Sequence, residues 1–162
     1  MTPRCSFAIV FVATLIIALL FNSPFFNPAQ ATNQQLKQAG TAKGVEEIFK
    51  RWGEAGKEVA RRNLMLDWLF IVVYVAMWIA AGRNFWPDLL WTKIAVGAGL
   101  AGAIADIVEN LHLRMLLQGE VTDRIAHSCK VASSINVALF SLAMLYFMIA
   151  AIGSGCRPQA SL

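Results

Sequence analysis

The sequence predicts an all-α fold in which transmembrane helices pack as a polytopic bundle. Hydrophobic residues make up 57% of the 162 residues, and charged residues only 15%. A soluble domain of this length rarely combines so few charges with so many apolar side chains. The apolar residues also gather in blocks, and several blocks reach the roughly 20 residues that a helix needs to cross the hydrocarbon core.

The first apolar block, residues 6–21, follows Arg4 and has two interpretations. As a signal peptide, it has a basic start, a short apolar core and an A-x-A cleavage site in AQA at residues 29–31. As a retained helix, it spans residues 7–26. The bundle therefore has four spans, or three if residues 1–31 are a cleaved signal peptide.

Residues 32–63 are predicted to form a polar linker followed by an amphipathic helix. The linker has glycine breaks, and the helix carries apolar residues at helical spacing opposite charged ones. Such a helix lies in the membrane interface, or alternatively docks on the end of the bundle. The apolar positions are Val45, Ile48, Phe49, Trp52 and Val59.

The remaining chain predicts a three-helix transmembrane core over residues 64–152 and a polar tail at 153–162. The connections between the spans are too short to form domains, so consecutive spans are antiparallel neighbours. The three predicted spans cover residues 64–81, 91–113 and 131–152.

Loop charges indicate the orientation of the chain. Residues 22–63 hold seven basic residues, and the connection 114–130 holds Arg114, Arg124 and Lys130. The positive-inside rule places both segments in the cytoplasm. A cleaved signal peptide would export residues 32–63 instead, so the two signals conflict. The seven basic residues on one side of the second span favour the retained helix.

Polar residues interrupt the apolar span at residues 91–113. No charged residue lies between Lys93 and Asp106, yet Glu109 and Asn110 follow within one turn. A helical projection places the two residues Asp106 and Asn110 on one face with small residues, which let a neighbouring helix approach closely in lipid. These small residues are Ala95, Gly99, Gly102 and Ala103.

The chain direction predicts that polar residues of three spans meet at one end of the bundle. The second span begins on the side where the third span ends, and the fourth span begins there too. A carboxylate near the bilayer centre costs about 2.5–3.5 kcal/mol on insertion scales, so it should face inward and find a partner. The resulting candidate site comprises Asp67, Tyr74, Asp106, Glu109, Asn110, Lys130 and Ser134.

Two functions compete for this polar site. In the first, the cluster of Asp67, Asp106, Glu109 and Asn110 belongs to a non-catalytic membrane protein and binds a partner helix, a cation or a lipid headgroup. In the second, an intramembrane enzyme acts on a lipid with Asp106 or Glu109 as acid and base. No nucleophile arrangement accompanies these carboxylates, which favours the non-catalytic function. A purely structural role, such as interhelical hydrogen bonding by Asn110, is a third possibility.

Composition and motifs exclude several other functions and partners. No HxxxH or CxxC spacing predicts a metal site, and no cofactor is expected, because GAGLAG at residues 97–102 lies inside an apolar helix without a preceding strand. A net charge of +4 suits anionic lipid headgroups, whereas no basic stripe with exposed aromatics indicates nucleic acid. The expected partners are the lipid bilayer and a second copy of the chain or another membrane protein.

Three stretches together resemble a known group of proteins. They are AGTAKGVEEIFKRWG, RRNLMLDWLFIVVYVAMW and AGAIADIVENLHLRMLL, which cover most of residues 39–117. Their order resembles a group of small, uncharacterised bacterial four-helix integral membrane proteins with an A-D-x-x-E-N motif in the third span. The resemblance implies the bacterial inner membrane and draws attention to Asp67, Asp106, Glu109 and Asn110. It implies no activity.

Overall fold

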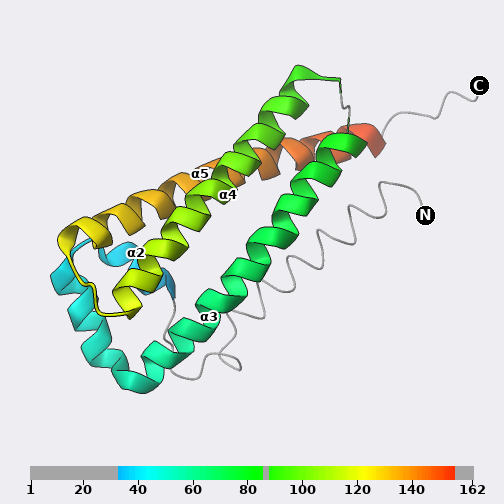
Figure 1. Cartoon of the computed structure of the whole chain (residues 1–162). Coiled ribbons are helices and arrows are strands. Elements are labelled where there is room, and N and C mark those ends of the chain that lie inside the picture. Colours follow the sequence, from blue (N-terminus) through cyan, green and yellow to red (C-terminus); the bar gives the residue numbers. More distant parts are fainter. Residues whose placement is uncertain (1–32, 86–87, 156–162) are drawn as a thin grey trace, which may run out of the picture.

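The computed structural model describes residues 33–85 and 88–155, and this part of the chain is built from four helices (Figure 1). The predicted first span, the signal-peptide alternative and most of the polar tail lie outside the described residues. The helices are α2 (Asn33–Ala39), α3 (Ala42–Asn84), α4 (Leu90–Leu117) and α5 (Asp123–Gly155).

The predicted helical bundle is confirmed for the described residues. Helices α3, α4 and α5 are each long and apolar enough to cross a membrane. They follow one another in antiparallel order through short connections, and the most extensive packing joins α4 to α5 (Figure 1). At one end of the bundle, the Thr92 hydroxyl bonds the Phe85 carbonyl at 3.1 Å and the Tyr146 hydroxyl at 2.7 Å.

Helix α3 bends at Gly53, where the backbone φ is 61°. This left-handed conformation is accessible to glycine at little cost, and it turns the residues before the bend across the end of the bundle (Figure 1). The apolar face of this first segment belongs to one buried core with α4: Val45 and Ile48 are buried in the same cluster as Leu113 and Leu116. The segment is thus docked on the bundle, and its position relative to a membrane surface stays a prediction.

Hydrogen bonds from both sides of the bend fix α3 to the ends of α4 and α5. The Ala42 amide donates to the Asp123 carboxylate at 2.7 Å, and the Arg61 guanidinium donates to the Leu117 carbonyl at 3.3 Å. Both acceptors lie at helix termini, where backbone and side-chain groups need partners from outside the helix. Helix α3 therefore covers the end of the bundle where α4 ends and α5 begins.

One polar and one apolar contact hold the short helix α2 at this same end of the bundle. The Trp52 indole donates to the Gln35 side chain at 3.0 Å, and Leu36 is completely buried in the core cluster beneath it. Gly40 then reverses the chain with a φ of 67° and leads into α3. These contacts orient Lys37, which follows Gln35 and Leu36 in the sequence and precedes the turn at Gly40.

Two apolar cores occupy the bundle, with polar residues between them. One core contains Ile71 and Trp78, and the other contains Leu64 and Leu113. On α3 the boundary between the cores falls around Asp67. On α4 it falls between Ala103 and Leu113, the stretch predicted to hold the polar site, so packing on both sides determines where these polar residues lie.

The predicted small-residue face of α4 is the face that packs in the bundle. Ala95, Gly99, Gly102 and Ala103 are all buried, as are Asp106 and Asn110. Gly99 is the tightest point, because a Cβ atom there would lie 2.7–2.8 Å from ring atoms of Trp78. A Trp ring fixed by neighbouring aromatic side chains cannot move aside at low cost.

We expect Gly99→Ala to lower the free energy of unfolding by about 1–3 kcal/mol through overpacking against Trp78. Gly97→Ala is the matched control, because Gly97 is exposed on the same helix and a Cβ there meets no atom within 4 Å. Denaturation of both variants in detergent measures the difference. Equal stability of the two variants would contradict the close packing of α3 on α4.

Candidate functional site

The candidate site is the carboxylate cluster, which we define as Asp67 on α3 with Asp106 and Glu109 on α4. Glu109 is completely buried, and Asp106 is only 8% exposed. Ionised carboxylates are seldom buried unless cations or hydrogen-bond donors surround them. The neighbours of these three groups therefore indicate what the site can hold.

Lys37 of α2 supplies a cation to the cluster. Its ammonium forms an ion pair with Glu109 and lies 4.0 Å from a carboxylate oxygen of Asp67. The Lys37 side chain is only 15% exposed, so the helix that carries it covers the cluster from outside. Two of the three carboxylates, Glu109 and Asp67, thus lie within ion-pair distance of one ammonium, and Asp106 forms no ion pair within the described residues.

Asp106 has neutral hydrogen-bond partners. The Tyr74 hydroxyl donates to its carboxylate at 2.8 Å, and the Asn136 side chain also bonds it from α5. The Tyr74 ring is held by edge contacts with Phe70 and Phe140, whose centroids lie 5.3 and 5.6 Å away. The hydroxyl is therefore directed at Asp106 by packed aromatic side chains.

Helix α5 completes the site with small polar residues. Ser133 is 8% exposed and lies beside Glu109, and buried Cys129 packs with its sulfur 4.0 Å from the Glu109 carbonyl. Asn110 is completely buried next to Glu109, and neither atom of its amide group has a hydrogen-bond partner among the described residues. Such an amide costs about 1–3 kcal/mol unless a further group satisfies it.

The structure brings five of the predicted site residues together and places two elsewhere. Lys130 and Ser134 lie on an exposed face of α5, whereas the polar residues that α5 turns inward are Ser133 and Asn136. The Ser134 hydroxyl donates to the Lys130 carbonyl at 3.0 Å. A serine that bonds its own helix needs no interhelical partner, so its polarity did not predict the inward face.

Lys37 is the site residue that the sequence analysis missed. It counted only as one of the basic residues of segment 22–63, because the first part of residues 32–63 was predicted to be a linker. The apolar Leu36 beside it was the available signal, since an apolar residue in a polar segment can anchor that segment to a core. The placement of α2 over α4 is a tertiary contact that helical periodicity within a span does not report.

The environment of Lys37 stabilises its charged form. Burial by itself disfavours the ammonium, but the carboxylates of Glu109 and Asp67 outweigh this and raise the pKa of Lys37 above its ordinary value. A raised pKa in the folded state means that folding stabilises the protonated lysine. The contribution is complete below the pKa of an unfolded lysine, about 10.4, and is lost as the pH rises through the folded-state pKa.

We therefore expect the stability difference between the wild type and Lys37→Met to depend on pH only in the alkaline range. The difference should be constant from about pH 8 to about pH 10 and should shrink above that, as the ammonium loses its proton. Melting temperatures of both proteins across this range provide the test. A difference that shrinks as the pH falls toward 8 would show that another group controls it.

Comparisons with known proteins give no further guidance, since no family model, curated protein or solved structure matches the chain. The resemblance to small bacterial four-helix membrane proteins stays a prediction. Among the residues that the structure describes, no three His, Cys, Asp or Glu side chains are grouped so that they could hold a metal ion.

Proposed function

We propose that the protein is a small multi-pass protein of the bacterial inner membrane whose carboxylate cluster binds an ammonium group. The observation that carries this proposal is the ion pair of Lys37 with completely buried Glu109. In this arrangement, the ammonium of α2 occupies the cluster as a built-in cation. An external amine, such as the headgroup of an aminophospholipid, would have to take the place of Lys37.

The balance of charge supports a cationic ligand. Glu109 and Asp67 share the one ammonium of Lys37, and Asp106 has no cation within ion-pair distance among the described residues. Asp106 is bonded by Tyr74 and Asn136, which are neutral. A buried site with this excess of acceptors attracts positive charge strongly, because the local dielectric constant is low.

The arrangement of the hydrogen-bond acceptors supports an ammonium in particular. An ammonium group has three N–H donors and needs acceptors in different directions. Glu109 and Asp67 both lie within ion-pair distance of the Lys37 ammonium and come from different helices. Oxygen atoms from α3 and α4 can thus bond one ammonium together.

The other functions considered for the cluster fit this arrangement less well. A partner helix would need the polar face to be free, but α2 covers it. An intramembrane enzyme would need Asp106 or Glu109 to reach a substrate, and Glu109 is completely buried beneath Lys37. Binding of a cationic group requires only that Lys37 exchange with a ligand.

Mass spectrometry of lipids and small molecules extracted with the purified protein tests the proposal. We expect an amine-bearing species to be enriched in Lys37→Ala, where the built-in cation is removed, and lost in Lys37→Ala/Asp106→Asn. The matched control is Lys37→Ala/Asp88→Asn, because Asp88 is exposed at the other end of the bundle. Loss of the species in the control as well, or no enrichment in Lys37→Ala, would refute ammonium binding at the cluster.

A further inference from the structure

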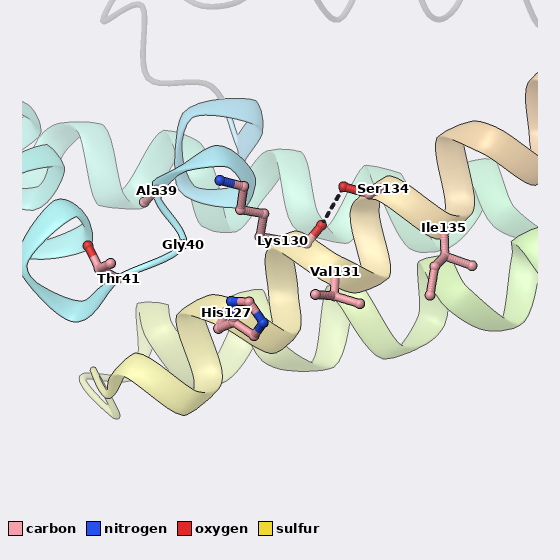
Figure 2. Close-up of a pocket in the computed structure, with 8 residues that line it drawn as sticks. All are labelled: Ala39, Gly40, Thr41, His127, Lys130, Val131, Ser134 and Ile135. Carbon is pink, nitrogen blue, oxygen red and sulfur yellow. Dashed lines mark hydrogen bonds between the residues drawn. The ribbon is translucent and has the colours of Figure 1, made fainter.

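A second feature lies on the outer face of α5, away from the carboxylate cluster. Two hollows flank a ridge formed by His127, Val131 and Ile135, which all line both of them. One hollow, of about 310 Å³, lies beside the turn at Gly40, and the other, of about 540 Å³, lies between α4 and α5. Figure 2 shows the first of these hollows.

The first hollow has a mixed polar and apolar lining and carries a positive charge. Lys130 extends from α5 toward Ala39 and Gly40, and a Cβ atom on Gly40 would lie 3.5 Å from its ammonium nitrogen (Figure 2). None of the ion pairs within the described residues includes Lys130. The lining contains His127 and no acidic residue. This hollow therefore suits an anionic group.

The second hollow changes from polar to apolar along its length. His112 and His127 line it near the end of α4 and the start of α5, and Ala105, Val108 and Ile135 line it further along both helices. At a rise of about 1.5 Å per residue, Ile135 lies about 12 Å deeper than His127, and Ala105 about 10 Å deeper than His112. Because α4 and α5 are antiparallel, both polar ends lie at the same end of the bundle.

We infer that this face of α5 binds an anionic phospholipid. Its phosphate would lie between Lys130 and His127, and an acyl chain would fill the hollow along Val108 and Ile135. The site would match the lipid in two places: the Lys130 ammonium is suited to the phosphate, and the apolar part of the second hollow is suited to the acyl chain. Basic pockets beside transmembrane helices commonly bind anionic headgroups in this way.

The charge of the headgroup site is tested with phosphatidylglycerol and phosphatidylcholine as probes. Native mass spectrometry of the full-length protein in detergent should show tighter retention of phosphatidylglycerol than of phosphatidylcholine. Lys130→Ala should weaken that retention about fivefold, the effect expected of one lysine near a membrane surface. Lys130→Arg should keep it, and so should Lys93→Ala, which removes an exposed lysine at the opposite end of α4.

The acyl-chain part is tested by filling the hollow. Val108→Trp should displace phosphatidylglycerol, whereas Val137→Trp should not, because Val137 is 57% exposed on α5 and lines neither hollow. Three results would overturn the inference: equal retention of the two lipids, unchanged retention in Lys130→Ala, or displacement of the lipid by millimolar inorganic phosphate. The last result would indicate a site for soluble anions. None of these residues belongs to the carboxylate cluster, so this inference and the ammonium site can fail separately.

Discussion

Lys37→Ala should lower the free energy of unfolding by about 3–5 kcal/mol, which is the usual cost of removing one partner from a buried ion pair. Most of this cost comes from Glu109, which is completely buried and would lose its cation. The double variant Lys37→Ala/Glu109→Gln should recover much of the loss, since a neutral amide has less need of a cation. Denaturant titration of the wild type, both single variants and the double variant measures the coupling energy between the two residues.

Lys57→Ala is the matched control for this cycle. Lys57 pairs with Glu54 at 2.8 Å, but Glu54 is 81% exposed, so water can solvate its carboxylate when Lys57 is removed. An exposed pair of this kind contributes about 0–1 kcal/mol. If Lys37→Ala and Lys57→Ala cost the same, or if Glu109→Gln brings no recovery, Lys37 is not a buried partner of Glu109 in the folded protein.

Trp78→Ala should also lower the free energy of unfolding by about 3–5 kcal/mol, because it opens a large cavity in the apolar core. Trp78 is completely buried and stacks on Phe147 with ring centroids 5.7 Å apart. Its edge contact with Phe140 links it to Tyr74, since Phe140 also contacts the Tyr74 ring. The substitution should therefore loosen the hydroxyl that bonds Asp106 as well as the core.

Trp91→Ala provides the comparison for Trp78→Ala, because Trp91 is 63% exposed. Its removal should change the free energy of unfolding by less than about 0.5 kcal/mol. Near-ultraviolet circular dichroism of both variants, recorded with their denaturation curves, separates loss of packing from loss of a chromophore. A small effect of Trp78→Ala would mean that the helices do not pack through this ring.

The helices and the inward face of α4 were predictable, because their physical causes lie within single segments. Length and hydropathy identify the spans. Small residues at helical spacing indicate the packed face, and they placed Asp106 and Asn110 on it correctly. The gathering of Tyr74 and Asp106 at one end of the bundle also followed, since antiparallel spans bring the start of one to the end of the next, but their hydrogen bond was not predicted.

The errors concern residues whose positions depend on contacts between segments. On α5, the polar periodicity of Lys130 and Ser134 predicted an inward face, but the packed face there holds Ala126, Cys129 and Ala132. Lysine can extend its ammonium to the headgroup level, and serine can bond its own helix, so neither has to face inward. Lys37 was missed for the same reason, because only the docking of α2 brings it to Glu109.

The most direct test of the ammonium site is to restore the missing cation of Lys37→Ala from solution. Propylammonium chloride should raise the melting temperature of this variant with concentration, and at a hundred times its dissociation constant it should add about 2.7 kcal/mol of stability. Potassium chloride at equal ionic strength controls for salt. We expect the rescue in Lys37→Ala and none in Lys37→Ala/Glu109→Gln. No rescue, or an equal shift in both variants, would contradict an ammonium site at the carboxylate cluster.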